Sequence, residues 1–558
     1  MRNIIVVEAY STGVNYIADI VNRGFSPVVL EVGLEEDSPL FESRREGYKQ
    51  IRDKYELIRE QENYEATLAL VRSYDPVVIV PGSERGVILA NRLAADLSLP
   101  GNPVDILPQM TRKDAMQEAL GKAGVRAIRG RVVTSAEEAL AFCAENRFEE
   151  AVVKPTESAG SVGLFLCSDR EEVKSAVDEL LAMKDIYGRE ITEVLVQEQI
   201  HGTEYVVNAA VCGGIPRLTS IFRYKKIRTA EGGYIYDNAE TIGELEPGHT
   251  ALVEYAYDTV RAIGIQYGAV HGEYMVDEKG PVLIEVNCRP IGASMPAEFL
   301  NRIFGQHETD SVLDSYLSPK RFFREMEKPY RTFSQGYLKF IKVPKDMSSK
   351  SLPIWVIAEN LSSTYKISLP DRHANRFFIK TRDVESAGGV IYMVNPDKAA
   401  ADRDIKLLTD IEDMYFEYIF NDGLSRRLIP MKNACELNVD AYAETAGSVL
   451  VVSETGRQYP RGMVINAAQA DLVNDDFDLL VIDLGQYIIS SDEISILELM
   501  FKLMRKVKPG GMVIIGEETY QFMTYKRAGA ELILRILGYE IAAPAYNERG
   551  MVKGIRRH

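Results

Sequence analysis

The sequence predicts a multidomain protein of the α/β class, and three observations support this prediction. The chain has 558 residues, which is too long for a single hydrophobic core. Short apolar runs alternate with helical patterns over roughly residues 1–105, as they do in a parallel sheet with crossover helices. Near residue 280, two more apolar segments flank a tight turn and predict a hairpin of antiparallel strands.

The composition argues against several classes of protein. Hydrophobic residues make up 46% of the chain and charged residues 26%, which is ordinary for a globular protein. The net charge of −17 argues against a nucleic-acid or anionic-membrane partner, because either would need a basic face. The five cysteines are scattered and form no CxxC pair, so we expect reduced thiols and no zinc site. No apolar run is typical of a signal sequence or a membrane span, and we therefore expect a cytoplasmic protein.

The first part of the chain is expected to form a doubly wound parallel sheet. The predicted elements are strands at 4–7, 27–31 and 77–80, a helix at 14–23 and a long charged helical stretch at 41–73. Ligands of such sheets bind beyond the carboxyl ends of the strands, where Ser11–Gly13 and Gly82–Gly86 stand. We interpret the first as a structural turn, and Glu84 in the second as a candidate for holding a substrate ammonium group. A GxGxxG fingerprint is absent, so a dinucleotide is not indicated.

A predicted hairpin at residues 271–289 carries the strongest chemical signal. Its turn lies at residues 278–280, where Gly280 can adopt the left-handed conformation that such turns need. A three-residue turn pairs Asp277 with Pro281. Counting back along both strands, this register sets polar residues opposite each other in two pairs: Glu273 with Glu285, and His271 with Asn287.

These opposing residues predict a magnesium site. Glu285, Asn287 and Arg289 share one face of their strand because side chains alternate along a strand. The other face of that strand is expected to be apolar: Ile284, Val286 and Cys288. A surface strand with solvated charges would explain Glu273 alone, but it explains the joint pattern poorly. Mg²⁺ usually takes one or two carboxylates and completes its octahedron with phosphate oxygens, so we predict that Glu273, Glu285 and Asn287 bind it.

Two motifs between residues 129 and 204 fit a nucleotide site. Residues 129–200 are expected to form strand, helix, strand, loop, strand, helix and strand. Lys154 ends a buried strand, and the small residues that follow it could bring backbone N–H groups to phosphates: Ser158, Ala159, Gly160, Ser161 and Gly163. The segment from Gln197 to Glu204 fits a hinge that contacts adenine through the backbone and ribose through a carboxylate. An ordinary flexible connection and a helix cap or turn are the respective alternatives.

Taken together, these motifs resemble those of the ATP-grasp superfamily, and most of all its carboxylate–amine ligases typified by bacterial L-amino-acid ligases (dipeptide synthetases). The resemblance covers roughly residues 1–425 and rests on Lys113, the loop 154–163, the hinge 197–204, Glu273 and the Glu285-x-Asn287-x-Arg289 series. It implies an N-terminal pre-ATP-grasp domain at 1–110 and an ATP-grasp domain at 111–425. Within the second domain, about 126–200 would be a small lid subdomain.

The resemblance also implies roles for individual residues. ATP would be bound by phosphate-binding lysines, a lid loop, a hinge and a ribose-binding carboxylate: Lys113, Lys154, Ser158, Ala159, Gly160, Ser161, Glu198, Ile200 and Glu204. Gln197 stands where the family often has an acidic residue facing the adenine amino group, so its role is open. Glu273, Glu285 and Asn287 would hold Mg²⁺, two ions being expected and Mn²⁺ being a substitute. Arg289 would be catalytic and lie near the acyl phosphate.

Substrate contacts are harder to assign. Arg223 and Lys225 could clamp a substrate carboxylate, although strand-surface charges are as good an explanation. Tyr236 and Glu84 are further candidates for substrate binding.

The C-terminal segment, 426–558, resembles the second half of a class I S-adenosylmethionine methyltransferase fold. Its expected elements are strands at 477–483 and 507–515, helices up to residue 505 and at 530–537, and an antiparallel pair of 538–541 with 551–555. The first half departs from that family, since the strand at 448–456 lacks the Gly-x-Gly-x-Gly turn. We expect a Rossmann-like domain without methyl transfer, and a working methyltransferase is the alternative.

The function that the sequence predicts is an ADP-forming ligase. It would make an amide or peptide bond through an acyl phosphate, with an amino acid as one of its small-molecule substrates. An ATP-grasp enzyme with another acceptor (bicarbonate, a thiol or a nucleotide amine) is an alternative, and so is a non-catalytic nucleotide-binding scaffold. Ligases of this type are often homodimers.

Overall fold

The structure is a computed structural model of the chain. It describes residues 2–33, 54–156, 163–184, 190–229, 234–344, 346–348, 353–359, 361–369, 377–384, 386–420, 440–454, 458–459, 461–485, 499–500, 502–516, 534, 537–542 and 551–557. The chain divides into two compact units. Unit 1 comprises Met1–Lys342, Ser368–Ala374 and Ile379–Ala401, and unit 2 comprises Val343–Ile367, Asn375–Phe378 and Asp402–His558. The domain boundaries expected at residues 110 and 425 stay a prediction.

Unit 1 begins with a parallel sheet of four strands in the order β3-β2-β1-β4. The strands are β1 (Asn3–Val7), β2 (Ser26–Glu31), β3 (Glu56–Arg59) and β4 (Pro76–Pro81). Alternate side chains of β1 enter two cores, so that Ile4 and Val6 pack on one face of the sheet and Ile5 and Val7 on the other. Burial on both faces explains the unbroken apolar run of β1 and confirms the predicted parallel sheet.

Helices flank this sheet. They are η1 (Ser11–Val14), α1 (Asn15–Asn22), α3 (Tyr64–Ser73), α4 (Gly86–Asp96) and η2 (Val104–Ile106). The long helix expected over residues 41–73 is wrong in part, because Glu56–Arg59 pairs with β2 as an edge strand. Only Ile58 of that strand is buried, so its charged neighbours concealed the strand pattern. Residues 34–53 lie outside the described residues.

A small antiparallel sheet follows, in the order β5-β8-β6-β7. Its elements are β5 (Gly130–Val133), α7 (Ala136–Asn146), β6 (Ala151–Pro155), β7 (Phe165–Cys167), α8 (Arg170–Leu181) and β8 (Val194–Glu198). Phe142, Val153 and Val177 belong to the core that joins the two helices to the sheet. The order of strands and helices agrees with the prediction, and it sets Lys154 and Gln197 near the ends of neighbouring strands.

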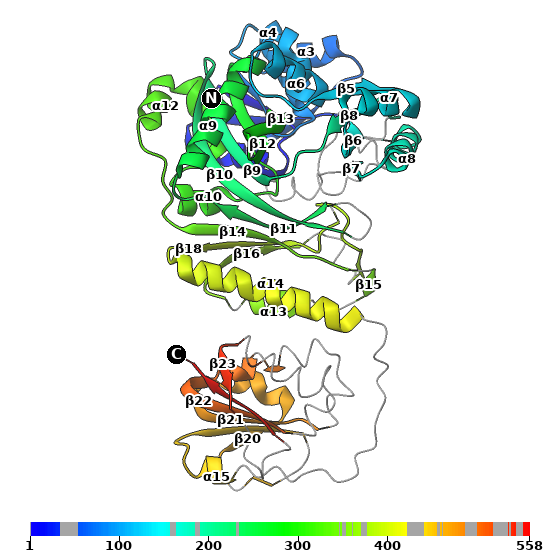
Figure 1. Ribbon diagram of the computed structural model, residues 1–558. Helices are drawn as coiled ribbons and strands as arrows, with labels where there is room; N and C mark the ends of the chain where they lie inside the picture. Colours follow the sequence, from blue (N-terminus) through cyan, green and yellow to red (C-terminus); the bar gives the residue numbers. More distant parts are fainter. Residues whose placement is uncertain are drawn as a thin grey trace. The chain divides into compact units, whose positions relative to one another are not determined.

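The large sheet of unit 1 is antiparallel and runs in the order β13-β12-β9-β10-β11-β14-β18 (Figure 1). Its strands are β9 (Thr203–Cys212), β10 (Ile215–Arg228), β11 (Tyr234–Thr241), β12 (Tyr267–Asp277), β13 (Gly280–Asn287), β14 (Gln335–Phe340) and β18 (Val390–Asn395). Val207 and Ala209 pack with helical residues such as Leu252 on one face. On the other face Ala210 packs with Val312.

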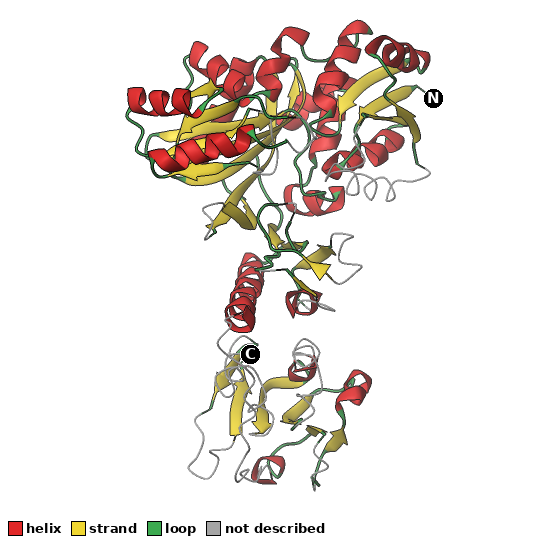
Figure 2. Ribbon diagram, turned by 90° about the vertical axis from the view of Figure 1, so that its right-hand side faces the viewer, coloured by secondary structure: helices red, strands yellow, loops and turns green. Residues whose placement is uncertain are grey.

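The helices associated with this sheet are α5 (Leu107–Thr111), α6 (Lys113–Lys122), α9 (Pro247–Ile263), α10 (Ala297–Phe304), α11 (Glu308–Leu317) and α12 (Pro319–Met326). Figure 2 shows helices packed against the sheets of unit 1. Lys113 is the first residue of α6, which fixes its ammonium group near the start of a helix that packs in the core beside β13.

The turn between β12 and β13 differs from the prediction. Asp277 pairs with Gly280, so the turn has two central residues and not three. Gly280 has a φ of 100°, as expected of a glycine at the end of such a turn. The shorter turn alone would move every later pair out of the predicted register.

A β-bulge restores the register. Tyr274 pairs with Leu283 and Glu273 with Glu285, so that Ile284 is an extra residue without a partner in the ladder. Glu273 therefore does face Glu285, as predicted, and His271 likewise faces Asn287. The placement of Ile284 on the apolar face is corrected, because Leu283 enters the core instead and Ile284 lines the cavity described below.

Unit 2 contains a mixed sheet in the order β20-β19-β21-β22-β24-β23. Its strands are β19 (Val449–Ser453), β20 (Met463–Ile465), β21 (Phe477–Asp483), β22 (Val507–Gly516), β23 (Tyr539–Ile541) and β24 (Met551–Arg556). β24 is antiparallel to both of its neighbours, which confirms the predicted closing pair. The helices expected up to residue 505 and at 530–537 fall largely outside the described residues.

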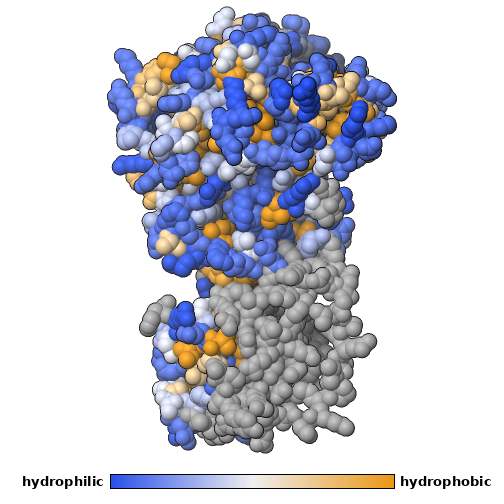
Figure 3. All heavy atoms as spheres, in the orientation of Figure 1, coloured by the Kyte–Doolittle hydropathy of each residue, from blue (hydrophilic) through white to orange (hydrophobic). Residues whose placement is uncertain are grey.

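The remaining elements are short, apart from one helix. They are β15 (Met347–Ser348), α13 (Pro353–Glu359), β16 (Thr364–Ser368), β17 (Phe377–Phe378), α14 (Lys398–Phe420), α15 (Asp440–Ala443) and η4 (Ala467–Leu472). Among the described residues, no helix is long and apolar enough to cross a membrane. On the face drawn in Figure 3, hydrophilic residues predominate and hydrophobic residues form small patches. Four cysteines are buried free thiols: Cys143, Cys167, Cys212 and Cys288.

Candidate active site

Unit 1 contains a cavity of about 430 Å³ that is lined by both the small and the large sheet. This volume lies in the range of ordinary ligand-binding pockets. The cavity gathers many of the residues that the sequence singled out: Lys113, Lys154, Gln197, Glu198, Ile200, Glu204, Lys225, Tyr236, Glu273 and Glu285. They come from elements spread over most of unit 1, so only the folded chain could assemble them.

The predicted metal ligands lie together on β12 and β13. The amide nitrogen of Asn287 donates to Oε1 of Glu285 at 3.2 Å. Nε2 of His271 lies 3.3 Å from Oε1 of Glu273, and its Nδ1 lies 2.8 Å from Oδ1 of Asn208. Burial lowers the pKa of His271, so the imidazole is neutral near pH 7. Two carboxylates and one amide side chain thus lie on neighbouring strands, and their oxygens are of the hard type that suits Mg²⁺.

Two buried lysines stand beside these carboxylates. Nζ of Lys113 lies 2.8 Å from Oε2 of Glu285. Burial, and then repulsion by Lys113, lowers the pKa of Lys154 to about 8. Burial by itself would raise the pKa of Glu285, but the ammonium of Lys113 outweighs it and brings the value to about 2. The cavity therefore presents cationic and anionic groups side by side, as a metal–polyphosphate ligand requires.

Glu204, the predicted ribose-binding carboxylate, forms an ion pair with Lys226 at 2.7 Å. Burial raises the pKa of Glu204, and the ammonium of Lys226 opposes that shift. The same ammonium lies 4.5 Å from the ring centroid of Tyr236. Sequence reasoning assigned Lys226 no role of its own beside Arg223 and Lys225, because a register shift between Lys225 and Lys226 in the β10–β11 pair cannot be read from alternation.

The other basic residues of β10 are placed differently. Arg223 is about half exposed, forms an ion pair with Glu240 and does not line the cavity. Lys225 lines the cavity, but its ammonium lies 3.0 Å from Oδ2 of Asp237. Tyr236 lines the cavity and packs edge-on against Tyr224, with ring centroids 5.1 Å apart. The structure therefore brings Lys225 and Tyr236 to the cavity and leaves Arg223 outside it.

The cavity also has an apolar part to its lining. Six aliphatic or thioether side chains contribute to it: Ile128, Val152, Leu164, Leu166, Met275 and Ile284. Gln197 is 2% exposed, and its buried Nε2 has no hydrogen-bond partner. A buried amide N–H without a hydrogen-bond acceptor costs free energy. The side chain of Gln197 therefore marks a place where a bound ligand can supply that acceptor. Glu198 is held by Arg129, whose Nη2 lies 2.6 Å from its Oε2, so the Glu198 carboxylate is already engaged.

The predicted phosphate loop falls in the segment that follows β6. Ser158, Ala159, Gly160 and Ser161 lie outside the described residues. The residues just before and after that segment, Pro155 and Leu164, line the cavity. Gly163 has a φ of 74°, a conformation that favours glycine.

Arg289 lies beside Glu84, which follows β4 of the parallel sheet. Nε of Arg289 is 3.8 Å from Oε2 of Glu84, and its Nη1 donates to the carbonyl of Pro290 at 3.0 Å. The sequence proposed these two residues for the acyl phosphate and for a substrate ammonium. The fold brings them together although they stand in different parts of the chain. Neither residue is among those that line the cavity, so they form a neighbouring part of the site.

The loop after Arg289 is held from two sides. The hydroxyl of Thr12 donates to the carbonyl of Gly292 at 3.0 Å and accepts from the Met295 N–H at 3.0 Å. Ala293 and Ser294 both have positive φ, at 62° and 48°, which is strained for non-glycine residues. The segment Ser11–Gly13, interpreted from the sequence as a turn, thus also anchors this loop.

Glu308 is a second anchor that sequence reasoning missed. Its Oε2 accepts from the Ile291 N–H at 2.9 Å, and its buried Oε1 has no hydrogen-bond partner. Burial raises the pKa of Glu308 to about 8. The residue opens α11 in a run of acidic and polar residues, so nothing in the local pattern distinguishes it from a solvated helix start.

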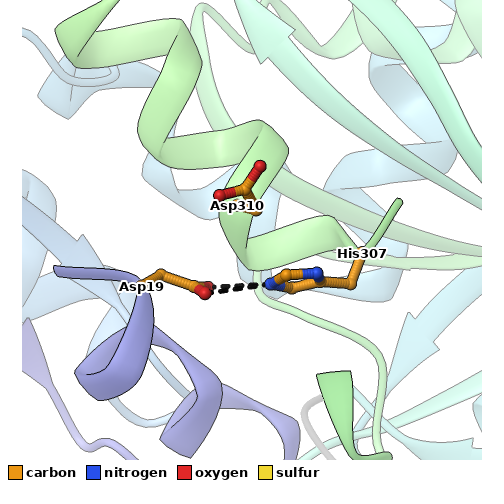
Figure 4. A group of neighbouring side chains, drawn as sticks. All are labelled: Asp19, His307 and Asp310. Carbon is orange, nitrogen blue, oxygen red and sulfur yellow. Dashed lines mark hydrogen bonds and ion pairs between the residues drawn. The ribbon is translucent and has the colours of Figure 1, made fainter. Parts of the chain in front are cut away.

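A further acidic and histidine cluster joins α1 to α11. Figure 4 shows His307 facing Asp19, with Asp310 on the nearby helix. Nε2 of His307 lies 3.0 Å from Oδ1 of Asp19, and the Thr309 hydroxyl donates to Oδ2 of Asp19 at 2.6 Å. Arg23 lies 2.6 Å from Asp310. These hydrogen bonds and the ion pair fit a contact that holds the two helices together.

Part of the chain is similar to a known family. Residues 148–298 match the family described as ATP-grasp domain. The match includes the hinge, the β12–β13 hairpin and Arg289.

Related sequences include two kinds of synthase. The chain is 30% identical over 269 residues to dapdiamide A synthase of Enterobacter agglomerans, covering 48% of this chain and 63% of that protein. It is 26% identical over 229 residues to the carbamoyl phosphate synthase large chain of Thermus thermophilus, covering 38% of this chain and 22% of that protein. The chain thus spans less than two thirds of the length of these relatives.

Solved structures agree on the fold. The L-amino acid ligase from Bacillus licheniformis has a TM-score of 0.57 at 16% identity, covering 74% of this chain and 97% of that one. The N5-carboxyaminoimidazole synthase from Aspergillus clavatus, solved with ADP, has a TM-score of 0.54 at 14% identity, covering 74% and 99%. At these identities the likeness establishes the ATP-grasp fold and nothing finer.

Proposed function

We propose that the protein is an ATP-dependent, ADP-forming carboxylate–amine ligase that makes an amide or peptide bond, with an amino acid as one substrate. The observation that carries this proposal is the single cavity in which Lys113, Lys154, Glu273 and Glu285 meet beside the hinge. Such a set serves a triphosphate and its metal ion, and a non-catalytic scaffold would not also need Arg289 next to Glu84. The resemblance to dapdiamide A synthase supports the choice of an amide-forming reaction.

The residues present fit MgATP. Glu273, Glu285 and Asn287 would hold the metal, which supplies positive charge to the terminal phosphates. Lys113 and Lys154 would bind phosphate oxygens, and Glu204 the ribose. Gln197 would meet the adenine edge with its unsatisfied amide, in the part of the cavity lined by apolar side chains. The roles of Glu198 and Ile200 through the backbone, and of Ser158–Ser161 over the phosphates, belong to the same proposal.

The reaction then follows in two steps. A substrate carboxylate oxygen attacks the γ-phosphorus of ATP, the bond to ADP breaks and an acyl phosphate forms. The amine nitrogen attacks the acyl carbon, phosphate leaves and the nitrogen loses a proton. Arg289 would stabilise the charge that develops on the phosphoryl and acyl oxygens. Glu84 would hold the ammonium of an amino-acid substrate, and the strained loop at Ala293 and Ser294 would shape the same pocket.

A direct test is phosphate release from MgATP with pooled amino acids, followed by single pairs. We expect release that depends on adding two amino acids, or one amino acid and a second carboxylate, with an amide product detectable by mass spectrometry. Release that depends on bicarbonate, a thiol or a nucleotide amine would assign the chain to another ATP-grasp reaction. No nucleotide binding and no turnover with any pool would refute the enzymatic proposal.

A further inference from the structure

Both carboxylate oxygens of Glu285 are engaged by groups of the protein itself. Nζ of Lys113 lies 2.8 Å from Oε2, and Nδ2 of Asn287 lies 3.2 Å from Oε1. On the opposing strand, Oε1 of Glu273 lies 3.3 Å from Nε2 of His271. In this arrangement Glu285 faces two donors of the protein, and the amide of Asn287 turns its nitrogen, not its oxygen, toward Glu285.

The pair of Lys113 and Glu285 is well shielded from water. The side chain of Lys113 is 9% exposed and that of Glu285 is 13% exposed. An ion pair in such surroundings is screened little by solvent, and removing either partner leaves a buried charge uncompensated. A divalent cation that approaches Glu285 must therefore displace an ammonium group that already neutralises it.

We propose that Lys113 is a counter-ion that occupies Glu285 until nucleotide arrives, so that this site binds its metal tightly only together with a triphosphate. The inference rests on the proposed function, because it assumes that Glu285 is a metal ligand. It adds an order of binding to that function. The free metal ion binds weakly, and the metal ion binds tightly when it arrives together with the nucleotide.

The surroundings of Lys113 explain why a triphosphate would release it. Lys154 shares the cavity, and repulsion between the two ammonium groups contributes to the low pKa of Lys154. A polyphosphate brings several anionic oxygens into the same space and gives both lysines a new partner. Lys113 can then leave Glu285, and the Asn287 amide can rotate to offer its oxygen. Without nucleotide, the Lys113 ammonium has no phosphate oxygen to pair with. If it left Glu285, it would still be repelled by Lys154 and its charge would not be neutralised.

The test measures metal binding and needs no turnover. Bound Mn²⁺ is titrated by electron paramagnetic resonance with wild type and Lys113→Met, each without nucleotide, and with wild type plus a non-hydrolysable ATP analogue. We expect Lys113→Met to bind Mn²⁺ at least about tenfold more tightly than wild type without nucleotide, since the competing ammonium is gone. Wild type should reach comparable affinity only with the analogue. Lys113→Gln repeats the measurement with a polar side chain in case the methionine variant fails to fold.

Two matched controls distinguish removal of the ammonium that pairs with Glu285 from a general effect of removing positive charge from the cavity. Lys154→Met removes another buried lysine that acts on Glu285 through space, so its gain in nucleotide-free Mn²⁺ affinity should be at least about threefold smaller than that of Lys113→Met. Adding Glu285→Gln to Lys113→Met should abolish the gain. Equal gains from Lys113→Met and Lys154→Met would overturn the inference in favour of a general charge effect.

The two failures can be told apart. In the first case, wild type binds Mn²⁺ tightly with the analogue, but without nucleotide both Lys113 variants bind it no better than wild type does. The counter-ion inference is then wrong, and the metal site stands. If Mn²⁺ binds to none of these proteins, with or without the analogue, the metal site itself fails, and the proposed function fails with it.

Discussion

Arg289 and Glu84 form an ion pair, with Nε of the arginine 3.8 Å from Oε2 of the glutamate. Arg289 follows β13 of the large sheet, and Glu84 follows β4 of the parallel sheet. The pair therefore joins the end of the β12–β13 hairpin to the part of the chain where ligands of parallel sheets bind. A group that is transferred from nucleotide to substrate would have to pass between these two regions.

Arg289→Ala should abolish amide formation while the protein still folds. The arginine is the cation expected to stabilise developing oxyanion charge, and loss of one such group costs roughly a hundredfold or more in kcat in other enzymes. Steady-state phosphate release with the best substrate pair, compared with the melting temperature, measures both effects. Arg302→Ala is the control, because Arg302 forms an exposed ion pair with Glu298 on α10. Turnover close to wild type would refute the role of Arg289.

Glu84→Gln should act on the amine and not on the nucleotide. If Glu84 holds a substrate ammonium, the neutral amide raises the KM for the amino-acid substrate by about tenfold or more and leaves the KM for ATP unchanged. Initial rates with each substrate varied in turn give the two constants. A parallel rise in both constants would indicate that Glu84 acts only by positioning Arg289.

Ile284→Ala should weaken nucleotide binding by roughly tenfold. It removes three carbons that line the cavity, and these would contribute about 2.4 kcal/mol at full burial, but Ile284 is only partly buried. Titration calorimetry with ADP measures the change. Ile215→Ala, on the exposed end of β10, should leave the affinity unchanged. An unaltered affinity for ADP in Ile284→Ala would place the base elsewhere in the cavity.

The same hairpin illustrates what could be read from the sequence. Polar alternation located Glu273 opposite Glu285, yet the turn was one residue shorter than predicted and a bulge at Ile284 compensated for it. The local sequence pattern does not reveal a bulge. A bulge leaves one residue of the strand unpaired, here Ile284, while Glu273 and Glu285 still face each other. Glu308 was missed, and Lys226 was given no role of its own, for a related reason. Their contacts with Ile291 and Glu204 depend on how distant strands and helices meet.

Unit 2 should not bind S-adenosylmethionine at micromolar concentrations. Two acidic residues at the carboxyl ends of its parallel strands are already engaged, since Oε1 of Glu454 accepts from the Ala467 N–H at 2.7 Å and Asp483 accepts from the Tyr459 hydroxyl. A ligand hydroxyl group would have to displace these contacts. Calorimetric titration of the full chain is the measurement, with S-adenosylhomocysteine as a second probe. Micromolar binding of either compound would favour a methyltransferase.

Glu308→Gln should alter the pH dependence of stability. Burial raises the pKa of Glu308 to about 8 from its usual 4.5, so the folded protein retains a proton that the unfolded chain releases. This contribution to stability is fully present below about pH 4.5 and is lost as the pH rises toward 8, at up to about 1.4 kcal/mol per pH unit. The Ile291 N–H and Arg289 favour the ionised form and moderate the loss, and Tyr16 also faces the carboxyl group. The glutamine can still accept the Ile291 N–H but does not titrate. The melting temperature of Glu308→Gln relative to wild type should therefore increase from pH 5 to pH 8 and then level off, and a constant difference over that range would contradict the raised pKa.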